Sequence, residues 1–443
     1  MDEKENTHVS TDHGAAELRA AWDDLIAALE RARDAVDSEQ LHAPPPSERG
    51  LAEGYRYLLG FTFSAIERAF YEDPAFPYLR RAIQPTDKAT IDNADALYLS
   101  AAIDGDLTYR ISGTMVPKAP QYLIFETHTA YAGDSGSLME LSPAVRMITG
   151  SLDTDELRVD ADGRFEIVVG PQRPAGYAGD FLPSRTDTDN PGTARYLIVR
   201  VLFHDWAQEA CPDLQITRIG QDGDHPAPLD PAGAADRMRR IGQIVEGQMT
   251  FWNEFYDVIL EAHGDRNGDG VTFMPRNGLN TPARANLATG GGQNTNVYSG
   301  GVFDLAPDEA LLIEATVPVE PAYSGFHLSN LWGESLDYAN HQTSLNGFQA
   351  ERDDDGVIRY VVAGTDPGVP NWLDTTGLAN GFLSLRWTYS SDPDRLPEVT
   401  VTTVPLAEVR AHLPAATRVV PAGERAGQIA VRQAHVQRRY RQY

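Results

Sequence analysis

Two short stretches of the chain have similar sequences, and they indicate its fold. Residues 162–170 read DGRFEIVVG, and residues 355–363 read DGVIRYVVA. In each stretch an Asp-Gly pair precedes a run rich in β-branched and aromatic residues. Glycine adopts a positive φ at no steric cost, so Asp-Gly before such a run predicts a β-hairpin. We therefore expect the same hairpin in two separate regions.

The similarity continues beyond the two hairpins. Residues 180–183 read DFLP where residues 371–374 read NWLD, and RYLIVR at 195–200 matches GFLSLR at 381–386. The offset shrinks from 193 residues (162 to 355) to 186 residues (200 to 386), as deletions in loops would produce. We interpret the pattern as a duplicated β-domain. Chance similarity between hairpins is the alternative.

The matched strands both end in arginine, Arg200 in the first copy and Arg386 in the second. Each arginine alternates with apolar neighbours, so each is expected to point inward. A buried guanidinium needs carboxylate or carbonyl partners. An ion pair that closes each sandwich is the favoured hypothesis, and a clamp on a substrate is the alternative.

Other strands surround these matched segments. The candidates are 97–102, 108–113, 122–128, 156–159, 164–169, 196–203, 214–219, 310–317, 326–332, 358–363, 382–389 and 399–404. Short strands with frequent turns and no intervening helices predict antiparallel sandwiches rather than a βαβ fold. Apolar spacings of three or four predict helices over 17–36, 48–70 and 232–263, and 424–443 also reads as a helix.

These elements predict a mainly β fold with α additions. It comprises two antiparallel β-sandwich-like domains from an internal duplication, N-terminal helices, a long inter-domain helix and a C-terminal helix. The expected divisions are a helical region at 1–95, a first β-domain at 96–225, a connecting helix at 226–265, a second β-domain at 266–420 and a basic C-terminal helix at 421–443.

Charge and composition limit the partners. The chain of 443 residues carries 37 Lys and Arg against 64 Asp and Glu, a formal net charge of −27. Such a surface repels phosphate backbones and anionic lipid, so we expect no nucleic-acid and no membrane partner. A single cysteine, the absence of a secretory leader and the absence of an apolar run long enough to span a bilayer favour a cytoplasmic location.

No motif in the sequence indicates a cofactor or a metal. The eleven histidines form no metal-binding spacing, and no Walker or dinucleotide-binding loop occurs. Residues 265–271, DRNGDGV, match the first half of a calcium loop that includes Asp265 and Asp269. The twelfth position is Arg276, where calcium needs a bidentate carboxylate. A polar loop is therefore favoured, and calcium binding remains the alternative.

The stretch FHLSNLWGESLDY at 326–338 resembles the signature of the domain-of-unknown-function family 1214. Residues 366–375, DPGVPNWLDT, and the later LRW at 385–387 support the resemblance. AEGYRYL at 52–58 and DNADALY at 92–98 are similar to the long actinobacterial and proteobacterial members, a type related to domain-of-unknown-function family 1254 proteins. The resemblance implies a pair of β-sandwich-like domains with helical additions. It implies no reaction.

The richest cluster of polar and aromatic residues lies in and after this stretch. Glu334 and Asp337 are the candidate catalytic residues. The candidate ligand-binding residues are His327, Asn330, Trp332, Tyr338, His341, Asn371, Trp372, Asp374 and Arg386. Aromatic platforms, amides and carboxylates are typical of a polyol or sugar site. Paired carboxylates perform general acid–base catalysis when one pKa is raised. The alternative is that these residues only close the sandwich.

Two functions follow from this cluster. The first is an enzyme that acts on a polar or sugar-like substrate in the second β-domain, with Glu334 or Asp337 as the acid or base. The second is a non-catalytic ligand-binding or structural protein with the same pocket. Partner binding through the basic C-terminal helix is a third, less favoured hypothesis.

Overall fold

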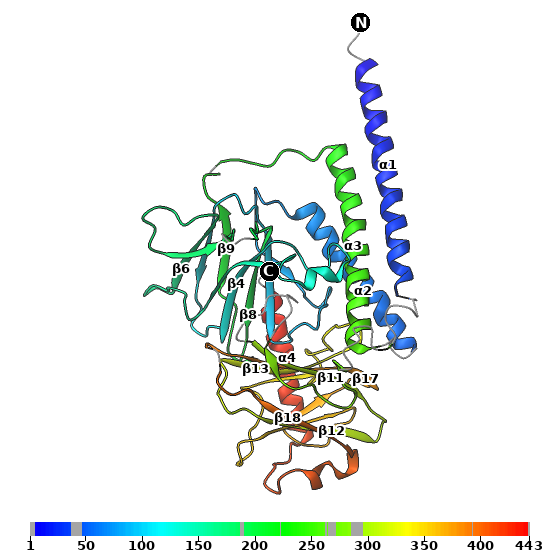
Figure 1. Cartoon of the computed structure of the whole chain (residues 1–443), viewed down its shortest axis with the longest axis vertical. Coiled ribbons are helices and arrows are strands. Elements are labelled where there is room, and N and C mark those ends of the chain that lie inside the picture. The colour runs from blue at the N-terminus through cyan, green and yellow to red at the C-terminus, as the bar shows by residue number, and fades with distance from the viewer. Residues whose placement is uncertain are drawn as a thin grey trace.

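The computed structural model describes residues 5–36, 47–186, 190–221, 223–261, 264, 272–284, 296–391 and 393–441. Helices α1 (Glu5–Asp34) and α2 (Glu48–Ile66) open the chain, and a π-helical turn (Glu67–Tyr71) continues α2. Figure 1 shows α1 beside the long helix α3 (Pro231–Leu260), on one flank of the β-rich body. In this described part, no helix is both long and apolar enough to cross a bilayer.

Among the described residues, nine strands precede α3 and nine follow it. The first nine are β1 (Arg80–Ala82), β2 (Ala96–Ala102), β3 (Tyr109–Thr114), β4 (Tyr122–His128), β5 (Ile148–Asp153), β6 (Arg164–Gly170), β7 (Asp180–Pro183), β8 (Tyr196–Leu202) and β9 (Asp213–Arg218). The next are β10 (Ala283–Arg284), β11 (Asn296–Asp304), β12 (Glu309–Thr316), β13 (Tyr323–Ser329), β14 (Ser344–Asn346), β15 (Ile358–Ala363), β16 (Trp372–Asp374), β17 (Asn380–Thr388) and β18 (Glu398–Pro405). A 3₁₀ helix (Leu406–His412) and α4 (Ala422–Arg441) complete the described chain.

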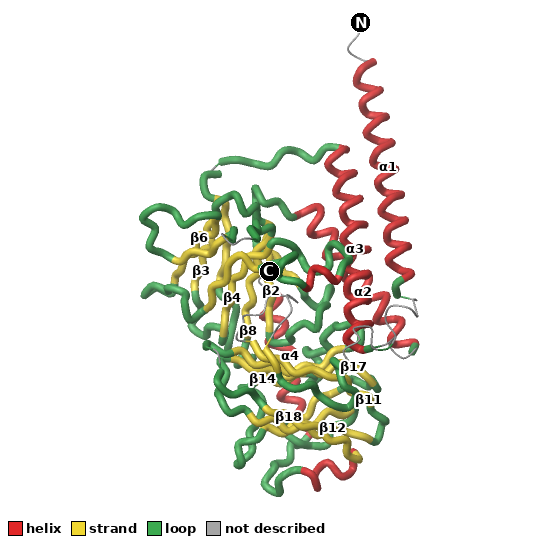
Figure 2. The backbone as a smooth tube through the Cα atoms, viewed as in Figure 1, coloured by secondary structure: helices red, strands yellow, loops and turns green. Residues whose placement is uncertain are grey.

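The two sets of strands have the same topology. In the first half, the sheet β1-β2-β8-β4-β5 packs on the sheet β7-β6-β3-β9. In the second half, β10-β11-β17-β13-β14 packs on β16-β15-β12-β18, which is the first arrangement with nine added to each strand number. A parallel strand pair is also shared, β6 with β7 and β15 with β16. The predicted mainly β fold with two sandwich-like halves and α additions is confirmed (Figure 2).

Each sandwich has its own apolar core, and the five-stranded sheets are covered on both faces. Every residue of β2, β4 and β8 is buried. One face of these strands supplies Leu97, Phe125 and Val199 to the first sandwich core. The opposite face supplies Tyr98 and Tyr196 to a separate cluster between the two halves. Alternation therefore places one set of side chains inside the sandwich and the other set at the junction of the sandwiches.

The helices pack against this junction. The predicted stripe on α3 is confirmed, because Ile241, Val245, Met249 and Trp252 are buried with residues of α1 and α2. Helix α4 spans both halves. Its Arg439 donates hydrogen bonds to the Ala94 and Ala96 carbonyl oxygens, and its Arg432 donates to Ser344. Arg432 and Arg439 thus bind mainly backbone and hydroxyl oxygen atoms, whereas Arg425 of the same helix pairs with Asp366 at 2.9 Å.

Several sequence expectations are corrected. Residues 156–159 form no strand, and the strand predicted at 326–332 ends at Ser329. Strands β5 and β11 were not predicted, since both contain glycine, which in a sequence reads as a loop. Gly301 in β11 permits close packing, because a Cβ at this position would clash with the Gly278 carbonyl oxygen.

Candidate functional site

A cavity of about 200 Å³ lies where the two sandwiches meet the helices. Its walls come from the outer faces of both five-stranded sheets, from α2 and α3, and from residues 80–92. One buried water needs only roughly 10–15 Å³ of such volume, so the cavity has room for a small organic molecule. The described wall is largely aromatic and aliphatic, and includes Phe61, Ile83, Tyr98, Tyr122, Ile124, Tyr131, Tyr196, Ile198, Ile244, Trp252 and Tyr298.

Two tyrosine–arginine pairs occupy equivalent positions in the cavity wall. In the first half Tyr98 of β2 lies opposite Arg200 of β8, and in the second half Tyr298 of β11 lies opposite Arg386 of β17. All four residues line the cavity. The Arg386 guanidinium lies 5.0 Å from the centroid of the Tyr298 ring. The arginines therefore face the space between the sandwiches, and the expectation that each closes the interior of its own sandwich is wrong.

A carboxylate on a neighbouring strand compensates the charge of Arg200. Its Nη1 lies 2.6 Å from Oε2 of Glu126 on β4, and Glu126 is 0% exposed. Burial opposes the charge on Glu126, but the Arg200 guanidinium and His128 outweigh it and lower the pKa of this carboxyl to about 2. Arg200 thus belongs to a buried ion pair.

Arg386 has no such partner. Within the described ranges, no carboxylate lies within 4.0 Å of its guanidinium, and its buried Nε atom makes no hydrogen bond. The strand register gives the reason. Glu126 lies opposite Ile198, two residues before Arg200, and His327 lies opposite Ser384, two residues before Arg386. Burial lowers the pKa of His327 to about 4, so a neutral imidazole stands where the first half has a carboxylate.

The other two arginines of the wall are paired. Arg68 donates to Asp134 at 2.9 Å and lies 3.6 Å from the centroid of the Tyr131 ring. Arg80 donates to Glu72 at 2.8 Å. Tyr131 in turn stacks on Tyr196, with ring centroids 3.9 Å apart. These contacts fix one end of the cavity as a rigid aromatic and ionic wall.

A carboxyl group also faces the cavity without a cation. Asp87 is 8% exposed, and its Oδ1 accepts a hydrogen bond from the Gln84 amide at 3.0 Å. No described residue donates to its Oδ2, and none places a cation within 4.0 Å of the group. Burial raises the pKa of Asp87 to about 7, although the Gln84 amide favours the charged form. By contrast, the Ser335 amide and hydroxyl bind the two oxygens of Asp92.

The structure places the two predicted catalytic residues outside this cavity. Glu334 is 3% exposed and accepts hydrogen bonds from Arg56 at 2.5 Å and from Asn330 at 2.7 Å. Asp337 is exposed, and its carboxylate accepts hydrogen bonds from the Ala339 and Asn340 amides of its own turn. Both carboxylates therefore have local partners.

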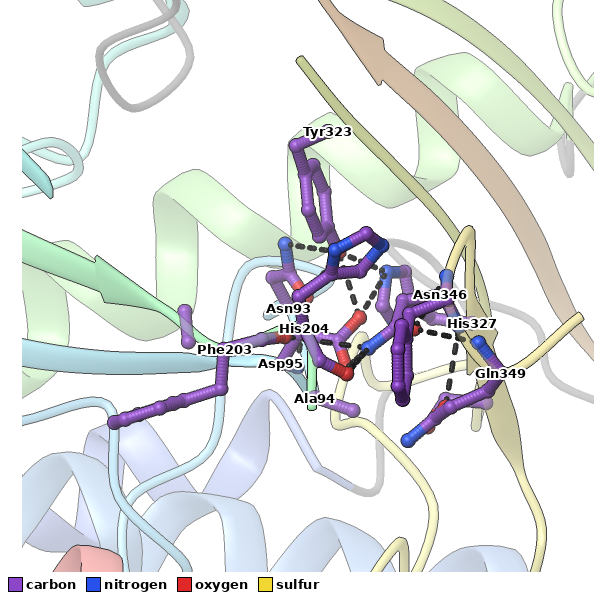
Figure 3. A network of polar contacts seen from close by, with 12 residues as sticks. Asn93, Ala94, Asp95, Phe203, His204, Tyr323, His327, Asn346 and Gln349 are labelled. Atoms are coloured by element: carbon purple, nitrogen blue, oxygen red, sulfur yellow. Dashed lines mark hydrogen bonds and ion pairs between the residues drawn. The ribbon is translucent and has the colours of Figure 1, made fainter. Parts of the chain in front are cut away.

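Three other predicted residues lie in separate contacts. Trp332 packs on Tyr57 of α2, with ring centroids 5.7 Å apart. Tyr338 enters the core of the first sandwich. His327 belongs to a buried network between the halves, where its Nε2 lies 3.3 Å from the Tyr323 hydroxyl and 3.8 Å from Oδ2 of Asp95 (Figure 3).

The remaining predicted residues lie along the far side of the second sandwich. His341 contacts Asp374 at 2.8 Å. The Asn371 side chain donates to the Glu351 carbonyl oxygen at 2.6 Å, and the Trp372 indole donates to the Ala363 carbonyl oxygen at 3.0 Å. Of the eleven predicted site residues, only Arg386 lines the cavity.

Two further expectations concern metals. The calcium-like segment 265–271, with Asp265 and Asp269, lies outside the described residues. Within the ranges that the structure does describe, no group of three or more His, Cys, Asp or Glu side chains could hold a metal ion.

Sequence reasoning missed Tyr98, Tyr298, Asp87 and the cavity function of Arg200. The matched segments at 195–200 and 381–386 contained a signal for the two arginines, since equivalent strand positions share one face. Tyr298 lies on the glycine-containing strand β11, which was not predicted. Asp87 precedes β2 in an irregular segment, so no periodicity marked it.

Comparison with known proteins finds similarity to proteins of unknown function. The family described as "Protein of unknown function (DUF1214)" matches residues 93–198, which include residues 93–98 of the DNADALY motif but not the 326–338 stretch. An uncharacterised protein of Burkholderia cenocepacia is similar in structure, with a TM-score of 0.73 and 29% identity over 89% of this chain and 99% of that one. A Vibrio parahaemolyticus protein aligns with a TM-score of 0.39 and 11% identity, over 85% of this chain and 100% of that one. No curated protein matches the sequence. The chain is therefore similar to the DUF1214 family over residues 93–198.

Proposed function

We propose that this protein binds a small organic anion in the cavity between its two sandwiches, with Arg386 as the contact for the anionic group. One observation carries the proposal. Two equivalent arginines line the same cavity, and Arg200 is paired with Glu126, whereas no described carboxylate pairs with Arg386.

The physical argument concerns the cost of a buried charge. An uncompensated guanidinium in an apolar setting is unfavourable, and a ligand carboxylate or phosphate removes that penalty. Guanidinium binds such groups through two parallel hydrogen bonds. The surrounding tyrosines and isoleucines suit an apolar or aromatic ligand body. A hydrophobic anion is therefore the ligand class that this wall favours.

Catalysis is the second candidate function. Glu334 and Asp337 remain a prediction for acid–base chemistry on a polar or sugar-like substrate, but Glu334 is occupied by Arg56 and Asn330. Better support for an enzyme comes from Asp87, which lines the cavity and has a pKa raised by burial to about 7. A carboxyl group with a pKa near the working pH is suited to general acid–base catalysis. Ligand binding requires no such step and is preferred.

We further propose that the two halves arose by internal duplication. The shared strand order, the shared parallel pair and the equivalent tyrosine–arginine pairs support this origin. A relationship to family 1254 and a cytoplasmic location remain predictions, as does the absence of nucleic-acid and membrane partners.

The test of the binding function is a panel of small carboxylates and phosphate monoesters, assayed by thermal shift and calorimetry. We expect wild-type protein to bind hydrophobic carboxylates and the Arg386→Met variant to lose at least about 1.5–3 kcal/mol of that affinity, the range for a charged hydrogen bond. Arg395→Met, at an exposed arginine, is the control and retains affinity. The proposal fails if no anion binds, or if both variants bind equally well.

A further inference from the structure

The charges of the cavity wall balance except at two places. Arg68, Arg80 and Arg200 each have a carboxylate partner within 3.0 Å. Arg386 has none among the described residues, and Asp87 has no cation within 4.0 Å among them. One cationic group and one acidic group therefore face the same cavity, and each lacks an oppositely charged partner among the described residues.

The two groups belong to different walls. Arg386 lies on β17 of the second sandwich, next to Tyr298. Asp87 lies in the segment between β1 and β2, against α2, where a Cβ on Gly60 would meet the Asp87 Cα atom at 3.1 Å. The charged groups that act on Asp87 are Glu67 and Arg80, and Arg80 is already bound by Glu67 and Glu72. A ligand that reaches both groups must extend along the cavity.

We propose that the natural ligand is a zwitterion, with an anionic group on Arg386 and a protonated amine on Oδ2 of Asp87, separated by an apolar body. This inference rests on the proposed binding function and specifies its ligand class. Such a molecule supplies each unpaired group with the opposite charge. A simple anion would leave the buried Asp87 carboxyl without a cationic partner.

Matched probes that share one ring test the idea. The first is 4-methylbenzoate, which offers only the anion, and the second is 4-methylbenzylamine, which offers only the amine. The third, 4-(aminomethyl)benzoate, offers both, and a homologous series of ω-amino acids varies the spacing between the charges. Calorimetry is performed on the full-length wild type and on the Asp87→Asn and Arg386→Met variants.

We expect the best-spaced zwitterion to bind wild type at least about tenfold more tightly than its matched anion, as one charged hydrogen bond provides. Asp87→Asn should remove this advantage, because the neutral amide offers the amine no opposite charge. Arg386→Met should weaken both the anion and the zwitterion. The Asn variant is nearly isosteric, and circular dichroism and thermal denaturation check that it is folded.

Proton release gives an independent readout. Because burial raises the pKa of Asp87 to about 7, about half of these groups are protonated in the free protein at pH 7, and amine binding ionises them. Binding enthalpies in buffers of different ionisation enthalpy should therefore report release of about half a proton in wild type and none in Asp87→Asn.

The outcomes separate the two proposals. If carboxylates bind but no amino group at any spacing improves affinity, the zwitterion inference is overturned and the anion-binding function stands. If neither carboxylates nor zwitterions bind, the anion-binding function is itself wrong. If the amine gain survives in Asp87→Asn, a different group binds the amine and the assignment to Asp87 is rejected.

Discussion

Burial removes hydration from Glu126, yet this carboxylate keeps its charge because Arg200 lies 2.6 Å away. At the equivalent position of the second half, His327 is neutral and cannot act in the same way on Arg386. The exchange of a carboxylate for an imidazole therefore changes the role of the arginine on the neighbouring strand. At this scale, charge pairing distinguishes a structural guanidinium from one that is available to a ligand.

We predict that Glu126→Gln costs about 3–5 kcal/mol of unfolding free energy at neutral pH, because Arg200 is left buried without a carboxylate. The pKa of Glu126 in the folded protein is about 2, below its ordinary value of 4.5. Its contribution is therefore present above about pH 4.5 and is lost as the pH falls toward 2. Urea denaturation across this range should show a steeper loss for wild type than for the variant.

Glu166→Gln is the matched control for this experiment. Glu166 pairs with Arg110 at 3.0 Å, but both side chains are nearly half exposed. A surface pair of this kind is worth about 0–1 kcal/mol. Equal losses in the two variants would contradict the assignment of Glu126 to a buried, stabilising pair.

A glycine in helix α2 allows this helix to pack closely against the second sandwich. Its N-terminal cap is Ser47, whose side chain accepts a hydrogen bond from the Gly50 amide at 2.9 Å. At Gly54 the helix approaches Trp332 so closely that a Cβ would lie 2.6 Å from the indole ring. Phe61, about two turns further along α2, lines the cavity. The close approach at Gly54 therefore brings α2 against the second sandwich and helps to close the cavity.

Two glycine-to-alanine changes in helices should have opposite effects on stability. Gly54→Ala is expected to destabilise the protein by about 1–3 kcal/mol, because the added methyl group overpacks against Trp332. Gly427→Ala in α4 has no neighbouring atom within 4 Å and should stabilise it by about 0.5–1 kcal/mol through helix propensity. Chemical denaturation measures the unfolding free energy of both variants. An unchanged value for Gly54→Ala would contradict the close approach of α2 to Trp332.

At the scale of the whole molecule, the two sandwiches are joined through a buried carboxylate. Asp95 is 0% exposed and accepts hydrogen bonds from the Tyr323 hydroxyl at 2.7 Å, the Trp206 indole at 2.9 Å and the Asn346 amide at 3.0 Å. Tyr323 and Asn346 belong to the second half (Figure 3). Trp206 follows β8 and belongs to the first half. This residue therefore holds both walls of the cavity in register.

We predict that Asp95→Asn loosens the junction, because an amide offers one acceptor oxygen and presents its own donors to the three existing donors. The expected loss is about 2–5 kcal/mol, and hydrogen exchange should rise first in β13, β14 and α4. Asp308→Asn, at an exposed position, is the control. Unchanged exchange at the junction in Asp95→Asn would contradict a joining role for this network.

Local sequence patterns predict the two β-regions, the buried stripe of α3 and the matched strands β6 and β15. These features depend on a period of two in strands and on spacings of three or four in helices. The same patterns placed Arg200 and Arg386 at equivalent positions. The expected β-hairpins are wrong, because β6 pairs with β3 and β7, and β15 pairs with β12 and β16, rather than with the segment before each Asp-Gly turn.

Only the three-dimensional contacts show what surrounds Arg200 and Arg386. Alternation shows which side chains share a face of a strand, but it does not show what covers that face. The residues of the cavity wall range from Phe61 to Thr388 in the sequence. Arg386 lacks a carboxylate partner among the described residues because the neighbouring strand places His327, rather than a glutamate, beside it. Because such contacts join residues that are far apart in the chain, no local pattern contains them.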